Sequence, residues 1–85
     1  MRIVFTTTAW NQYVGHTDRK LVKRVNDLIA DVARNGHEGV GKPEPLRGEL
    51  AGFWSRRIDR EHRLVYRIKG DDVEILACRY HYGER

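Results

Sequence analysis

The spacing of hydrophobic residues changes along the chain, and each change marks the border of a predicted element. Residues 2–5 form a short run typical of a strand, and the threonines at 6–8 offer hydroxyls that can cap a helix. A short first helix is predicted by apolar side chains that fall on one helical face: Ala9, Trp10, Tyr13 and Val14. Residues 15–18 break this pattern before a second helix.

The second helix has the clearest periodicity in the chain. Its apolar side chains repeat at three- and four-residue spacing: Leu21, Val22, Val25, Leu28, Ile29 and Val32. Thr17 or Asp18 can cap its start, and Asn35-Gly36 is a typical C-terminal stop. We expect this apolar stripe to face a sheet, because amphipathic helices usually bury such stripes in the core.

The rest of the chain is predicted to form one loop and several strands. Residues 36–48 are rich in glycine and proline and show no apolar periodicity, so we expect a surface loop there. The predicted strands cover residues 50–53, 54–59, 62–69 and 73–82, with a hairpin turn at 70–72. Residues 73–78 are apolar at both alternating sets of positions, which is typical of a strand at the centre of a sheet.

The predicted order is one strand, two helices and an antiparallel meander, which defines an α+β fold. We expect both helices to pack on one face of a twisted antiparallel sheet. The 85 residues suffice for a single domain, 1–85, with a modest core. No apolar run approaches the ~20 residues of a membrane helix, and the N-terminus lacks the pattern of a signal peptide. Since Cys78 is the only cysteine, no intrachain disulfide can form, and we expect a cytoplasmic protein without membrane contact.

Charge adds a preference for anionic partners. The net charge is +4, the isoelectric point is about 9.6, and arginine far outnumbers lysine. A guanidinium presents a planar fork of donors that matches phosphate oxygens. The composition is compatible with binding either nucleic acid or an acidic protein.

The loop holds the first candidate for chemistry. Glu44 lies between Pro43 and Pro45, and each proline restricts the backbone around the carboxylate. A catalytic base needs such stiffness, whereas an ordinary surface acid does not. A solvated loop acid without a catalytic role remains the alternative interpretation.

A second cluster covers residues 54–67 and runs into the predicted strand 62–69. Leu64, Tyr66 and Ile68 share one face, which suits the helices, so the other face carries Arg63 and Arg67. A flat array of arginine and aromatic groups suits a sugar–phosphate chain with unstacked bases. The alternative is a polar face of weak ion pairs with neighbouring acids.

The third cluster is the tail 79–82, which contains His81. Histidine is the side chain whose unperturbed pKa, about 6.5, lies near neutrality, so it can give a proton to a leaving oxygen, although a lone histidine is often structural. A carboxylate, guanidinium groups and an imidazole together supply what RNA transesterification requires, without a metal or other cofactor. The four histidines are scattered without metal-ligand spacing, and Cys78 is expected to be buried and inert.

Four segments together resemble the YoeB/Txe toxins of the RelE superfamily. They are GKPEPL (41–46), GFWSRRI (52–58), EHRLVY (61–66) and CRYHY (78–82). The resemblance covers nearly the whole chain and implies a RelE-like, microbial-RNase-like fold. It also implies the toxin of a toxin–antitoxin pair, a ribosome-dependent mRNA interferase that cleaves mRNA in the ribosomal A site.

The resemblance further implies roles for individual residues. Glu44 is the general base, Arg63 stabilises the phosphate with help from Arg57, His81 is the general acid, and Tyr82 stacks on or orients the substrate. Further phosphate-binding residues are expected at Arg47 and Arg56. We expect Arg56 to act mainly in docking, together with Arg60 and Lys20.

The implied partners are a cognate antitoxin, the ribosome with its mRNA, and a second copy in a homodimer. Operator DNA is expected only through the antitoxin complex. The sequence departs from the family in two places. Arg47 stands where lysine is common, which keeps the charge but changes hydrogen-bond geometry, and residues 83–85 extend beyond the usual end at Tyr82.

Two other functions fit the same fold. One is a non-cleaving module that blocks translation or binds operator DNA with its antitoxin, and the other is a gyrase-directed toxin of the ParE branch. The presence of Glu44, Arg63 and His81 favours cleavage, because a pure binder needs neither a base nor an acid at these positions.

Overall fold

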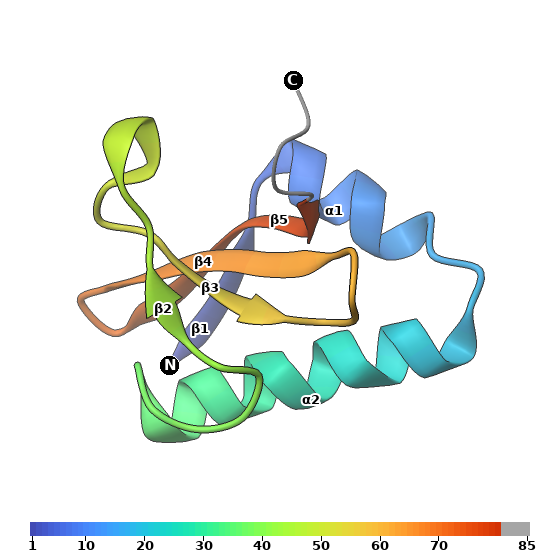
Figure 1. Ribbon diagram of the computed structural model, residues 1–85, viewed down its shortest axis with the longest axis horizontal. Helices are drawn as coiled ribbons and strands as arrows, with labels where there is room; N and C mark the ends of the chain where they lie inside the picture. The colour runs from blue at the N-terminus through green and yellow to red at the C-terminus, as the bar shows by residue number, and fades with distance from the viewer. Residues whose placement is uncertain (81–85) are drawn as a thin grey trace.

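The computed structural model describes residues 1–80 and contains two helices and a five-stranded sheet (Figure 1). In chain order the elements are β1 (Arg2–Phe5), α1 (Thr7–Val14), α2 (Arg19–Asn35), β2 (Glu44–Pro45), the 3₁₀ helix η1 (Gly48–Leu50), β3 (Trp54–Arg57), β4 (Arg63–Lys69) and β5 (Asp72–Tyr80). The strand order in the sheet is β1-β5-β4-β3-β2. The α+β architecture predicted from the sequence is therefore confirmed.

Both helices begin and end where their capping residues predict. The Thr6 hydroxyl accepts a hydrogen bond from the Ala9 amide (3.0 Å) at the start of α1. The Asp18 carboxylate accepts one from the Lys20 amide (2.8 Å) at the start of α2. Gly36 then ends α2 with a φ of +67°, a conformation that favours glycine.

One hydrophobic core joins the helices to a single face of the sheet. The α2 stripe buries Val25, Leu28 and Val32 against Leu64 and Tyr66 of β4. α1 contributes Ala9 to the same cluster. Because residues alternate along a strand, Arg63, Val65 and Arg67 lie on the other face, as predicted; that second face is called the open face below.

Several details of the fold differ from the sequence-based expectations. β1 pairs with β5 in parallel, so the sheet is mixed, and the middle strand is β4 while β5 lies between β1 and β4. Residues 50–53 form the end of η1 and a turn rather than a strand. Gly48 and Gly52 have φ values of +67° and +95°, which interrupt extended backbone on both sides of this segment.

A further difference concerns the loop predicted over residues 36–48. Its second half contains β2, which pairs antiparallel with β3 at the outer edge of the sheet. Figure 1 shows the chain curving past the end of α2 and then entering β2. The predicted strand 54–59 ends at Arg57, and the predicted strand 73–82 is described as far as Tyr80.

Candidate active site

Cross-strand register brings the candidate residues to one end of the open face. Glu44 of β2 lies opposite Ser55 of β3, and Ser55 lies opposite Val65 of β4. Two residues before Val65 on β4, Arg63 pairs with Arg57 of β3 on one side and with Tyr80 of β5 on the other. Residues directly opposite one another in a sheet share a face, so these six residues form one contiguous group on that face.

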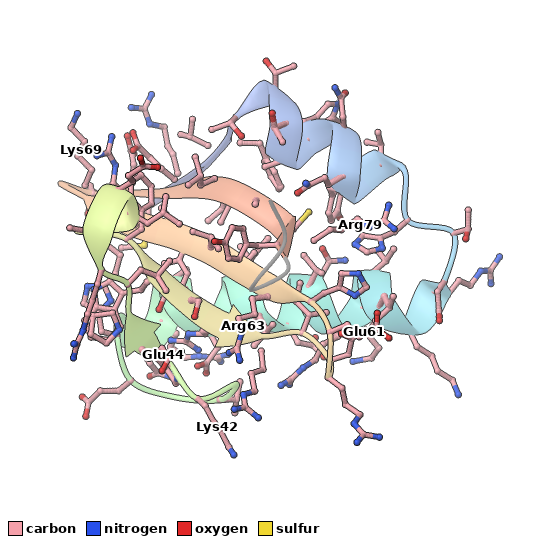
Figure 2. All side chains as sticks on the ribbon, turned by 45° about the horizontal axis from the view of Figure 1, so that its top comes forward. Lys42, Glu44, Glu61, Arg63, Lys69 and Arg79 are labelled. Carbon is pink, nitrogen blue, oxygen red and sulfur yellow. The ribbon has the colours of Figure 1, made fainter. Side chains whose placement is uncertain are left out.

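Glu44 and Arg63 form the centre of this group. Their carboxylate and guanidinium lie 4.0 Å apart (Oε1 to Nη1), and Figure 2 shows both side chains on the same side of the sheet. The Glu44 side chain is 54% exposed and that of Arg63 is 18% exposed. A partly exposed pair whose charged atoms are this far apart contributes only about 0–1 kcal/mol to stability. The pair therefore combines access for a substrate with opposite charges at close range.

The floor beside the pair is small and closed. Ser55 and Val65 are fully buried, and Ala77 is nearly so. These short side chains therefore support the pair from beneath, and the exposed part of Glu44 is where a substrate could make contact.

The backbone around Glu44 is held more firmly than the two flanking prolines alone would suggest. The Leu46 amide donates to the Phe53 carbonyl (2.9 Å), and the Arg57 amide donates to the Gly41 carbonyl (2.7 Å). These two bonds lie on either side of Glu44 and connect its segment to β3. The stiffness inferred from sequence is thus supplied mainly by strand pairing.

Arg56 requires a correction. The sequence placed it among the phosphate-binding residues, but its side chain is completely buried on the helix face of β3. Its guanidinium forms an ion pair with Asp31 of α2 and donates to the hydroxyl of Tyr66 (3.3 Å). It cannot reach a substrate on the open face. The alternation of side chains along β3 could have indicated this burial, because Arg56 lies on the same face as Trp54, which packs against the core.

The other predicted cations are exposed and differ in position. Arg57 lies on the open face at the end of β3, directly across from Arg63. Arg47 lies just after β2, and Arg60 lies in the turn between β3 and β4. Lys20 is in the first turn of α2, on the helix side of the sheet. The structure thus places Arg57 beside Arg63 in the sheet, whereas Lys20 belongs to a helix outside the sheet.

His81 and Tyr82 lie outside the described residues. They follow Tyr80, the Cα partner of Arg63, directly in the sequence. Their predicted roles remain predictions.

Comparison with known proteins identifies the family. The profile of the YoeB-like toxins of bacterial type II toxin–antitoxin systems matches residues 5–82. The chain belongs to this family. It is 57% identical over 84 residues to the toxin YoeB of Streptomyces coelicolor, covering 96% of this chain and 100% of that protein. It is 50% identical, with the same coverage, to the toxin YoeB of Escherichia coli K12.

Solved structures agree with this assignment to the YoeB-like toxins. A YoeB/ParE toxin from Agrobacterium tumefaciens superposes with a TM-score of 0.92 at 46% identity, covering 96% of this chain and all of that one. A YoeB dimer from Staphylococcus aureus has a TM-score of 0.90 at 44% identity, covering 96% and 98%. YafQ from Escherichia coli, with a TM-score of 0.73 at 15% identity, shares the fold alone.

Cys78 and His37 of this YoeB-like toxin pack within the fold and lie outside the candidate site. Burial raises the pKa of the Cys78 thiol to about 11, and its sulfur lies 3.4 Å from the Ala9 carbonyl oxygen. His37 stacks on Trp54 with ring centroids 4.0 Å apart. Burial is the larger cause that lowers the pKa of His37, and the charge of Arg56 is the smaller one.

Within residues 1–80, no three His, Cys, Asp or Glu side chains gather as a metal site would require. Neither helix described here has the length and apolar character needed to cross a membrane.

Acid stability should depend on Asp31 in this YoeB-like toxin. The hydrogen bond from Arg56 lowers the pKa of Asp31 below its ordinary value of 3.8. The stabilisation is therefore present above pH 3.8 and is lost as the pH falls through the lower, folded-state pKa. We expect the urea midpoint of the wild type to fall steeply below that pH, and that of Asp31→Asn to be lower at neutral pH and to change less with acid. Asp27→Asn, at an exposed surface pair, is the control; equal acid slopes for wild type and Asp31→Asn would contradict the assignment.

Proposed function

We propose that this YoeB-family protein is a ribosome-dependent endoribonuclease that cleaves mRNA in the ribosomal A site and so inhibits translation. The observation that carries the proposal is the Glu44–Arg63 pair, 4.0 Å apart on an accessible sheet face. A base and a phosphate-binding cation at that separation match the two ends of an attacking ribose hydroxyl and its neighbouring phosphate. Family membership supports the toxin role.

The proposed reaction uses the protein's own side chains for each proton. Glu44 accepts the proton of the ribose 2′-hydroxyl, and the oxygen attacks the adjacent phosphorus. Arg63, assisted by Arg57 and Arg47, stabilises the negative charge that develops on the phosphorane oxygens. His81 donates a proton to the departing 5′-oxygen, leaving a 2′,3′-cyclic phosphate and a 5′-hydroxyl. In this scheme Tyr82 stacks on or orients the substrate, and no metal ion takes part.

We propose the partners from the same family relation. One solved structure of a relative is a heterotetrameric YoeB–YefM toxin–antitoxin complex from Staphylococcus aureus, and another is a YoeB dimer from the same organism. By analogy, this chain forms a homodimer and is neutralised by a cognate antitoxin, and it reaches operator DNA only through that complex. Its net charge of +4 favours approach to ribosomal RNA and mRNA.

Primer extension on a translated mRNA, with and without ribosomes, tests the proposed function. We expect new 5′ ends within codons only when ribosomes are present. Translation arrest without new ends would indicate a non-cleaving module. Loss of DNA supercoiling activity by gyrase, with intact mRNA, would indicate a gyrase-directed toxin instead.

Arg63 and Arg60 should affect different kinetic parameters. Arg63 acts on charge that develops during the reaction, so Arg63→Ala should lower the single-turnover rate at saturating ribosomes by about 10²–10³-fold. Arg60 is exposed in a turn, so Arg60→Ala should weaken binding and reduce the salt dependence by about one phosphate contact. Rates measured across ribosome concentrations separate the two effects. If Arg63→Ala changes only the concentration dependence, Arg63 is merely a binding residue.

A further inference from the structure

The loop between α2 and β2 wraps around one fully buried side chain, Arg56. Its Nη2 donates to the carbonyl oxygens of Gly36 (2.7 Å) and Glu38 (2.8 Å), and its Nη1 donates to that of Val40 (3.1 Å). One guanidinium thus binds three alternate carbonyls of the same five-residue stretch. Charged hydrogen bonds in a buried site are stronger than neutral ones, so this stretch has one favoured conformation.

Asp31 of α2 completes this arrangement from the helix. Its carboxylate pairs with Arg56 and accepts hydrogen bonds from the Val40 amide (3.1 Å) and from the side chain of Asn35 (2.8 Å). The loop is thereby tied both to β3 through Arg56 and to α2 through Asp31. We call Asp31, Arg56 and residues 36–40 the loop clamp.

Two glycines show how closely the loop approaches the clamp. A Cβ on Gly39 would lie 2.0 Å from Asp31 Oδ2, and one on Gly41 would lie 2.8 Å from the Leu28 side chain. Both residues also have positive φ, +126° and +85°. Only glycine fits at these positions without moving the ion pair or the core.

The clamp matters for Glu44 because β2 contains only two residues. Side chains alternate between the faces of a sheet, so a one-residue slip would turn Glu44 from the open face to the helix face. A two-residue strand cannot specify its own register. Its register depends instead on where residues 36–41 are held. The Gly41 carbonyl, just before β2, accepts a hydrogen bond from the Arg57 amide of β3 and so links this stretch to the sheet.

We propose that Arg56 is a positioning residue for Glu44, and that the loop clamp sets the register of β2 on β3 and keeps the carboxylate beside Arg63. This inference rests on the proposed function, in which Glu44 is the base. Arg56 acts from the opposite face of the sheet: its side chain holds the loop, while its neighbour Ser55 lies opposite Glu44. It touches no substrate.

Hydrogen exchange tests the register without reference to activity. In Arg56→Lys the charge is kept, but a single ammonium group cannot reach the same carbonyls and Asp31 together. We expect protection of the Leu46 amide, which bonds to Phe53, to fall by about tenfold or more, while the β4 and β5 amides keep theirs. Val25→Ala, a core change on α2, is the control for general destabilisation. Unchanged protection at Leu46 would overturn the proposal.

Gly39→Ala provides a second route to the same structure. It leaves Arg56 intact but places a methyl group against Asp31, so it should lower Leu46 protection in the same way. It keeps the test valid if Arg56→Lys fails to fold. Normal protection at Leu46 in a folded Gly39→Ala protein would also count against the clamp.

Single-turnover cleavage on programmed ribosomes then separates positioning from stability. Arg56→Lys should lower the saturating rate by about 10–10²-fold, because a displacement of about 1 Å at a reacting group has effects of that size, and leave ribosome binding unchanged. In a Glu44→Gln background it should have no further effect. An equal loss in both backgrounds would make Arg56 merely structural and refute the proposal. If Glu44→Gln itself cleaves normally, the proposed function fails, and the exchange result alone decides the register.

Discussion

Replacing Glu44 by glutamine is expected to lower the single-turnover rate of mRNA cleavage by about 10²–10⁴-fold, the usual contribution of a general base. Glutamine keeps the size of the side chain and its place on β2, but it cannot accept the 2′-hydroxyl proton. The ion pair with Arg63 is long and half-exposed, so its loss should barely change folding. The fall in rate should therefore reflect chemistry.

The measurement is cleavage of a translated mRNA at saturating protein, with ribosome affinity determined separately. Glu49→Gln is the matched control, since Glu49 is an exposed acid five residues later in η1. We expect its rate and affinity to equal those of the wild type. Near-normal cleavage by Glu44→Gln would remove Glu44 from the mechanism.

Replacing His81 by alanine should impair cleavage of ordinary mRNA by about 10²–10⁴-fold, but much less when the scissile 5′-oxygen is replaced by sulfur. The alkoxide released from normal RNA needs a proton as it departs. A thiolate leaves without one, so the missing acid becomes unimportant. This comparison isolates the leaving-group step from every earlier one.

Glu44→Gln serves as the reference for the sulfur experiment. It should stay impaired on both messages, because it acts on the 2′-hydroxyl rather than on the leaving group. The ratio of the two rates for each variant is the quantity to compare. If sulfur fails to rescue His81→Ala, the histidine positions the phosphate or base and is not the acid.

Helices, strands and their buried faces were predictable where a hydrophobic pattern repeats along the chain. The α2 stripe specifies its buried face many times over, and Asp18 and Gly36 mark its ends. The alternation in β4 correctly separated Leu64 and Tyr66 from the arginines on the open face.

Features that depend on tertiary contacts were not predictable in this way. Two residues, Glu44 and Pro45, show no period, so β2 could not be distinguished from a loop. Alternation along β3 indicates the helix face for Arg56, but the three carbonyls and Asp31 that make its complete burial possible meet only in the folded chain. The parallel pairing of β1 with β5 likewise depends on how the intervening helices cross the sheet.

The prolines beside Glu44 have a consequence for association between molecules. β2 is the outer strand of the sheet, and unpaired amides on such an edge can recruit a strand from another chain. Successive amides along a strand point to opposite sides, and that of Leu46 points inward, to Phe53. The outward positions are then 43 and 45, and both are prolines, which have no amide hydrogen. The edge that carries the proposed base is thus poorly suited to β-aggregation, although it stays open to solvent.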